Sequence, residues 1–283
     1  MAVVLALWSA VVYGVADYCG GHATRRLPSP VVTCASQIGG LAALLCLLPI
    51  LGDPLPPARD WGWGAAGGVA GVFALVSFYR ALAEGAMTVV APTTAVVSAS
   101  VPVVVGLAQG ERPSGLALTG VALALVAVAL VGGVGSRSSE PSRPTPPYVV
   151  GLAVLAGLGF GFVFVTLGRA SDESGMWPLV SMRVVSIPLA FLLARRVRQR
   201  VERPLQRSTI VLTLVAGLLD MSANLLYLLA TRHGLLTVVG VVAALYPAST
   251  VALAFVRDGE RVGRIQVTGL LVAAGALVLV GMG

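Results

Sequence analysis

Hydrophobic and polar positions along this chain alternate in long segments. Apolar runs of about twenty residues, the length an α-helix needs to cross a membrane core, are separated by short polar stretches rich in Arg, Pro and Gly. The pattern therefore predicts an all-α membrane protein. Its ten predicted transmembrane helices are Ala2–Gly21, Pro30–Leu51, Trp61–Ala83, Met87–Leu107, Ser114–Gly135, Tyr148–Ala170, Met176–Ala194, Thr209–Thr231, Leu235–Val256 and Val262–Gly281.

Composition supports this class of protein. Of the 283 residues, 57% are hydrophobic and 11% are charged, whereas a soluble domain is charged at about one position in four. One polar stretch, 136–147, carries four prolines and is the plausible linker between two halves. The predicted domains are therefore a first repeat over 1–135, the linker 136–147, and a second repeat over 148–283.

The two halves resemble each other in sequence. Residues 85–90 align with 234–239, and at the same offset the Gly-Glu-Arg at 110–112 aligns with the Gly-Glu-Arg at 259–261. An ordered series of matches at one offset is typical of duplication. Since each half holds five predicted helices, an odd number, the second half must enter the membrane from the opposite side. The expected architecture is two inverted five-helix repeats, as in many secondary transporters.

The net charge of +7 comes from 19 basic residues, all of them Arg. Most lie in short loops between apolar runs, so they indicate membrane topology and not a nucleic-acid partner. They gather on one predicted side, most densely from Arg195 to Arg207. The positive-inside rule puts that side in the cytoplasm and both termini outside a cell (inner) membrane that the chain crosses many times. A cytoplasm-only reporter that is active when fused to the C-terminus would refute this orientation.

Asp220 is the most informative residue. It lies near the middle of the eighth run, where insertion of an Asp costs about 2.5–3.5 kcal/mol. Asn224 and Tyr227 follow on the same helical face. One interpretation is that Asp220 lines a midplane cavity and binds substrate or a coupling proton. The alternative is a structural hydrogen bond or ion pair between helices.

Arg183 is the natural partner for Asp220, because it is the one Arg near the centre of a run. If the two pair, they form a structural clasp or a gate that responds to substrate. If they do not, Arg183 is placed to receive an anionic group while Asp220 handles protons or cations. The sequence leaves both open.

Further candidates lie on other runs. Asp17 follows Tyr13 by four residues and faces either the cavity or the membrane interface. Proline frees a backbone carbonyl and bends a helix, so some runs are expected to kink, either to line a cavity or as static bends. The candidate kink residues are Pro92, Pro102 and Pro247. The full set of candidate substrate or coupling residues is Asp220, Asn224, Arg183, Tyr227, Asp17, Tyr13, Trp8 and Tyr246.

The sequence indicates no catalytic or metal-binding site. His22 and His233 both lie at run ends, and the three cysteines lack the spacing of metal ligands. No Gly-rich loop follows a strand to hold phosphate. We therefore expect no catalytic residues, no metal and no cofactor, and the chain is not predicted to be an enzyme. We expect Glu111 and Glu260 to anchor the loops in which they lie.

Three stretches carry a resemblance to a known family: residues 14–21, residues 217–224, and Leu245-Tyr246-Pro247 followed by Gly259-Glu260-Arg261. The chain resembles the ten-helix EamA-type family of the drug/metabolite transporter superfamily. That resemblance implies gradient-driven export or exchange of a small metabolite or drug in a lipid bilayer, by a monomer or homodimer, with protons a candidate coupling ion. The family often has Pro where this chain has Ser98. A passive facilitator or channel is the alternative, although no ring of charge or filter-like loop is visible.

Overall fold

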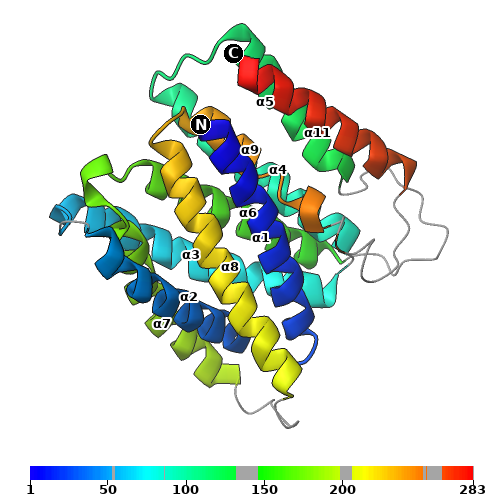
Figure 1. Cartoon of the computed structure of the whole chain (residues 1–283). Coiled ribbons are helices and arrows are strands. Elements are labelled where there is room, and N and C mark those ends of the chain that lie inside the picture. The colour runs from blue at the N-terminus through cyan, green and yellow to red at the C-terminus, as the bar shows by residue number, and fades with distance from the viewer. Residues whose placement is uncertain are drawn as a thin grey trace.

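The computed structural model describes residues 1–52, 55–85, 87–131, 146–197, 206–250, 253 and 263–282. Within these residues the chain is helical and carries no strand (Figure 1). Its elements are α1 (Ala2–Thr24), α2 (Ser29–Leu51), α3 (Ala58–Glu84), α4 (Met87–Ala108), α5 (Gly115–Val131), α6 (Pro147–Gly168), the 3₁₀ turn η1 (Asp172–Ser174), α7 (Trp177–Val197), α8 (Arg207–Thr231), α9 (Leu236–Ala243) and α11 (Arg264–Met282).

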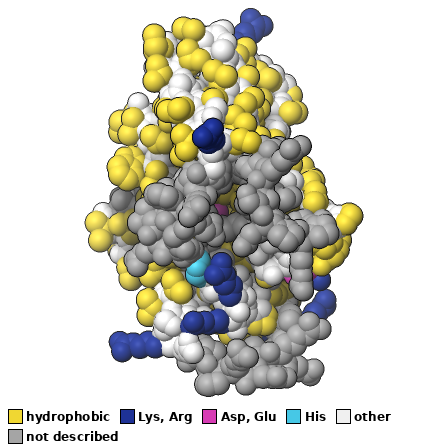
Figure 2. Space-filling model, turned by 90° about the vertical axis from the view of Figure 1, so that its right-hand side faces the viewer, with side chains coloured by type: hydrophobic (Ala, Val, Ile, Leu, Met, Phe, Trp, Pro, Cys, Tyr) yellow, Lys and Arg dark blue, Asp and Glu magenta, His cyan; other side chains and the backbone are white. Residues whose placement is uncertain are grey.

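The described helices form two packing groups: α1, α2, α3, α6, α7 and α8 in the first, and α4, α5, α9 and α11 in the second. In the described part of the chain, α1, α2, α3, α6, α7 and α8 are long and apolar enough to cross a membrane, and four apolar helical stretches are shorter. Large hydrophobic side chains remain exposed on the outside, for example Leu271 and Val104. Hydrophobic side chains also dominate the described part of the face in Figure 2. An apolar exterior of this kind suits lipid and not water.

The predicted runs are confirmed as helices, with ends that shift by a few residues. The first predicted run, Ala2–Gly21, extends to Thr24, and the third begins earlier, at Ala58. The ends of the fifth and ninth runs fall outside the described residues. So does the predicted linker 136–147, apart from Pro146, which precedes α6, and Pro147, which begins it.

The two groups of helices pack against each other. In the first group, α1 packs on α8, α6 packs on α3, and α2 contacts α7. In the second group, α5 lies along α11 and α4 contacts α9, and Figure 1 shows α5 and α11 side by side at one edge of the molecule. Contacts of α4 with α6 and of α1 with α9 join the groups. When the two repeats are swapped, the contact of α1 with α8 becomes that of α6 with α3, and the contact of α4 with α6 becomes that of α9 with α1. Such matched contacts are what a pseudo-twofold axis between the repeats requires.

The repeats run in opposite senses. Arg26, after α1, donates a hydrogen bond to Gln206, just before α8, so α1 ends where α8 begins. Because α2 then crosses back, α3 begins at the other end of the bundle. There, Ser171, in the turn after α6, donates a hydrogen bond to Asp60 in the first turn of α3. The third helices of the two repeats thus start at opposite ends, which is inverted topology.

Pro247 breaks its run, whereas Pro102 does not break α4. After α9 ends at Ala243, residues 244–246 form a turn and the chain is helical again over 247–250. Pro247 has no N–H to continue the helical ladder. In the first repeat the equivalent position is Ser98, and α4 runs through it unbroken. Pro102 packs against Gly240 of α9. The side chain of Pro92 lies outside the described residues.

Glu111 anchors the first half to the second. Its carboxylate accepts hydrogen bonds from the backbone N–H groups of Leu236 (2.8 Å) and Thr237 (2.9 Å) and from the Thr237 hydroxyl (2.6 Å). Leu236 is the first residue of α9, so the carboxylate satisfies N–H groups that a helix start leaves unpaired and complements the helix dipole. The loop between α4 and α5 is thereby tied to α9.

We expect Glu111→Gln to lower the free energy of unfolding by about 1–2 kcal/mol, because an amide lacks the charge and offers one acceptor oxygen instead of two. The measurement is the melting temperature of the purified protein in detergent. Glu173→Gln is the matched control, since Glu173 is exposed. Equal melting temperatures for both variants would show that the Glu111 contacts contribute nothing to stability.

Candidate functional site

A cavity lies among the helices of the first group, and both repeats line it. Its walls come from α1, α2 and α3 of the first repeat and from α6, α7 and α8 of the second, together with Tyr246 from the break after α9. The space between these side chains is continuous with open solvent. Glycines at Gly68 and Gly71 of α3 keep one wall free of side chains.

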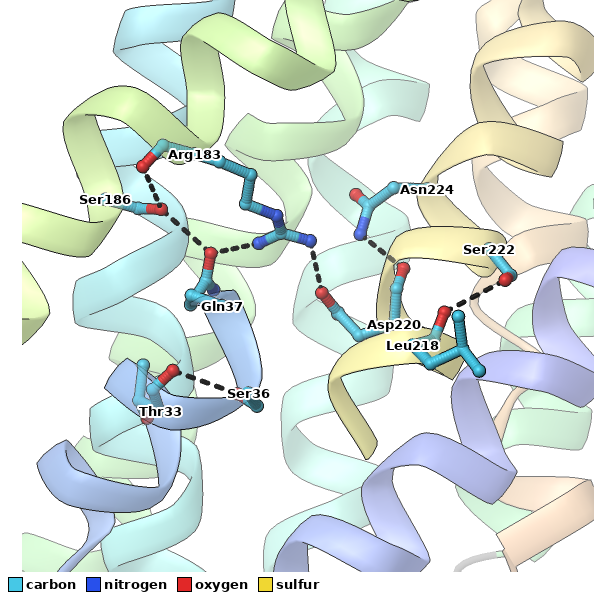
Figure 3. Close-up of polar contacts among 9 residues, drawn as sticks. All are labelled: Thr33, Ser36, Gln37, Arg183, Ser186, Leu218, Asp220, Ser222 and Asn224. Atoms are coloured by element: carbon cyan, nitrogen blue, oxygen red, sulfur yellow. Dashed lines mark hydrogen bonds and ion pairs between the residues drawn. The ribbon is translucent and has the colours of Figure 1, made fainter. Parts of the chain in front are cut away.

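Arg183 and Asp220 form an ion pair at this cavity. The Arg183 Nη2 donates to Asp220 Oδ2 at 2.5 Å, joining α7 to α8 (Figure 3). The Arg183 side chain is 3% exposed and that of Asp220 is 26% exposed. A charged hydrogen bond with so little water around it is stronger than one at a surface, and either charge left alone there would be costly. Of the two arrangements that the sequence left open, the structure therefore has the paired one.

Gln37 completes the polar cluster from α2. Its Oε1 accepts a hydrogen bond from Arg183 Nη1 and another from the Ser186 hydroxyl at 2.8 Å. Figure 3 shows the guanidinium lying between the Gln37 amide and the Asp220 carboxylate. Three helices, α2, α7 and α8, are thus held together through one arginine side chain.

Asn224 lies one turn beyond Asp220 and also lines the cavity. Its Nδ2 donates to the backbone carbonyl of Asp220 at 2.7 Å, and in the described part of the chain no hydrogen bond reaches its side-chain oxygen. This bond holds the amide against its own helix, as Figure 3 shows. Asn224 therefore offers an acceptor to the cavity and does not neutralise the Asp220 charge.

Asp17 is the second carboxylate of the cavity. It lies on α1, partly buried, and lines the same cavity as Asp220. Among the described residues, no hydrogen bond or ion pair reaches the Asp17 side chain. Of the two alternatives for Asp17, the structure has the one in which it faces the cavity. When all groups are ionised, two carboxylates face one guanidinium, and the cavity keeps one negative charge.

Aromatic rings form much of the remaining wall. Tyr13 lies one turn before Asp17, and its ring centroid is 6.0 Å from that of Phe164 on α6. Phe160 and Tyr246 also line the cavity. Phe164 is held from behind by Tyr227, which stacks on it at 4.5 Å and donates a hydrogen bond to its carbonyl at 3.2 Å. The wall is therefore fixed by packing.

Two predicted residues lie elsewhere. Tyr227 is fully buried, stacks on Phe164 and is not among the residues that line the cavity. Trp8 is 59% exposed on the outer face of α1. It lies nine residues before Asp17, and nine residues at 100° each place two side chains on opposite faces of a helix. Trp8 therefore faces away from the cavity.

The sequence reasoning missed several lining residues. Gln37 and Ser186 belong to the ion-pair cluster, yet an amide or hydroxyl within an apolar run is a weaker signal than a charge. Gln37 is the one amide in α2, and that feature would have drawn attention to it. Phe160, Phe164 and Met182 lie in apolar runs, where nothing in the sequence distinguishes them from lipid-facing residues. In the described part of the chain, no group of His, Cys, Asp or Glu is arranged to hold a metal ion.

Comparisons with known proteins agree with this arrangement. A model of the EamA-like transporter family matches residues 1–133 and 148–282. A solved structure titled only "Crystal structure of protein" is similar with a TM-score of 0.75, covering 99% of this chain and 97% of its own, at 13% identity. At that identity the likeness shows the fold alone. No curated protein matches the chain.

Proposed function

Because the chain belongs to the EamA-like transporter family, we propose that it is a secondary carrier that moves a small metabolite or drug-like molecule across the cell membrane by alternating access. The family consists of membrane transporters, and its members are not enzymes. The finer proposal is export or exchange coupled to a gradient, with protons as the coupling ion. In this mechanism the helices of one repeat rock against those of the other around a fixed site.

One observation supports this proposal most directly: three charged groups within the described membrane-spanning helices lie at one cavity that both repeats line. Asp17 comes from the first repeat, whereas Arg183 and Asp220 come from the second. Charged residues within membrane-spanning segments are costly and typically mark the pathway of a substrate or ion. A purely structural bundle would have no need for a carboxylate without a partner.

The Arg183–Asp220 pair suits a gate. It links α7 to α8, and Gln37 extends the link to α2 of the other repeat. A substrate or proton that neutralises Asp220 weakens its hold on Arg183 and loosens this link. Charge at the binding site would then be coupled to the relative position of the two repeats, which alternating access requires.

Transport by the purified protein in proteoliposomes tests the proposal. We expect a panel of small amines, organic acids, amino acids and neutral solutes to include at least one whose flux saturates with concentration and rises with a pH gradient. Asp220→Asn should lower that gradient-driven flux at least ten-fold, and Glu173→Gln should leave it unchanged. Flux that does not saturate would identify a channel. Unchanged flux in Asp220→Asn would remove Asp220 from the mechanism.

A further inference from the structure

We propose that the cavity binds an organic cation carrying one positive charge, with Asp17 as its counter-charge and the rings of Tyr13, Phe160 and Phe164 as its walls. This inference deepens the proposed function by naming the substrate class of the same site, and it rests on the cavity being the transport site. It follows from the charges, the rings and the apolar surface that the cavity presents.

The charge of the cavity favours a cation. Arg183 donates through its two terminal nitrogens to Gln37 and Asp220, and its Nε has no hydrogen-bond partner. Among the described residues, Asp17 has no hydrogen bond or ion pair, and it lines the same cavity as Asp220. A carboxylate in a site with little water is stabilised when a cation joins it. A ligand with one positive charge brings the three ionised groups and itself to neutrality.

An anion fits this site poorly. The guanidinium has N–H groups beyond the two that bond Gln37 and Asp220, and its Nε has no partner. An anion that reached these groups would still be a third negative group, beside Asp17 and Asp220, facing one guanidinium. Like charges in a medium of low dielectric repel strongly. The Arg183–Asp220 pair therefore leaves Asp17 as the cavity carboxylate that has no partner among the described residues.

The aromatic lining favours a cation with an apolar body. An aromatic ring presents a negative face, and a cation within about 6 Å of its centroid is attracted to it. Tyr13 precedes Asp17 by one helical turn, so ring and carboxylate lie on the same face of α1. Phe160 and Phe164 are likewise one turn apart on α6, and Tyr227 fixes the Phe164 ring. The apolar side chains of Leu75, Val163 and Met182 offer contact for the rest of the ligand.

The experiment uses the purified full chain in nanodiscs and two probes of the same shape. Phenyltrimethylammonium carries a permanent positive charge, and tert-butylbenzene replaces its nitrogen with carbon. We expect calorimetry to show saturable binding of the cation at least ten-fold tighter than that of the neutral isostere, and no saturable binding of the anion benzenesulfonate. Equal binding of the two isosteres, or a preference for benzenesulfonate, would overturn the proposal without any variant being made.

Variants then locate the charge. Asp17→Asn should weaken phenyltrimethylammonium binding at least ten-fold and bring it close to that of the neutral isostere, while Asp17→Glu should retain most of it. Glu173→Gln, which changes an exposed carboxylate, should have no effect. Unchanged binding in a folded Asp17→Asn protein, shown by an unaltered melting temperature, would rule out Asp17 as the counter-charge.

Binding and flux separate this inference from the proposed function. If the cation binds as expected but no solute of any charge class crosses proteoliposomes saturably, the carrier proposal fails and the ligand class stands. If saturable flux is found for acids or neutral solutes while the cation does not bind, the carrier proposal stands and the ligand class is refuted.

Discussion

Arg183→Met should lower the free energy of unfolding by about 3 kcal/mol, and adding Asp220→Leu should recover most of that loss. Removing one member of a buried ion pair typically costs about 3–5 kcal/mol, because the other charge is left without a partner. The lower part of that range applies here, since the Asp220 side chain is 26% exposed to the cavity and keeps some water. Replacing both charges with apolar groups removes the penalty.

Melting temperatures in detergent of the wild type, both single variants and the double variant measure this coupling. Arg80→Met is the matched control. Arg80 pairs with Glu84 one turn away at 3.0 Å, with side chains 59% and 35% exposed, and such surface pairs contribute about 0.5 kcal/mol. If the double variant is no more stable than Arg183→Met alone, the loss comes from arginine packing and not from an unpaired charge.

The same variants address the gate. The double variant should regain stability but not gradient-driven flux, because transport in the proposed mechanism needs the pair to form and release. A double variant that is both stable and fully active would reduce the Arg183–Asp220 pair to a structural contact. Stability and flux therefore report on different roles of one interaction.

The fold was largely predictable from sequence. The ten runs were visible because lipid requires about twenty apolar residues per crossing, and inversion followed from five crossings in each repeat. Helix ends were less certain: α1 continues through His22 to Thr24, past the predicted end at Gly21. Polar residues near an interface tolerate either helix or loop, so hydropathy alone does not fix the last turn.

The site was predictable only in part. Helical periodicity places Asp220 and Asn224 on one face of α8, but it does not predict which helix packs against that face. The contact with Arg183 depends on how α7 packs beside α8, and no pattern within either run states that. Tyr227 shows a further limit. It shares the face of Asp220 but lies seven residues on, about 10 Å along the helix axis, which carries it past the cavity to the back of Phe164.

Pro247 predicted a kink in the ninth run, but the sequence did not predict what this break does to the cavity. The break leaves α4 and α9 different in shape although their sequences are related, since Ser98 supplies an N–H where Pro247 cannot. It also lets Tyr246 reach the cavity from a bundle that otherwise stands apart from it. The two repeats thus differ at Ser98 and Pro247, and Pro247 directly follows Tyr246, which lines the cavity.

Gly217→Ala should destabilise the protein by about 3 kcal/mol and abolish gradient-driven flux. A Cβ added at Gly217 would stand 2.0 Å from the backbone carbonyl oxygen of Ser36 on α2, closer than any real contact. Neither backbone can give way without separating α8 from α2. Overpacking of this kind costs about 1–3 kcal/mol and occasionally more. Membrane helices use small residues for such close approach because lipid supplies no hydrophobic drive to association.

The expected loss of flux follows from the position of Gly217 one turn before Asp220. Moving α8 away from α2 draws the Asp220 carboxylate away from the guanidinium that Gln37 of α2 holds. Gly151→Ala is the matched control, because Gly151 is also within a helix, and a Cβ there meets nothing within 4 Å. Helix propensity alone favours alanine over glycine by about 1 kcal/mol, so Gly151→Ala should raise the melting temperature while Gly217→Ala lowers it. The same change in melting temperature for both variants would mean that the close approach of α2 and α8 does not position Asp220.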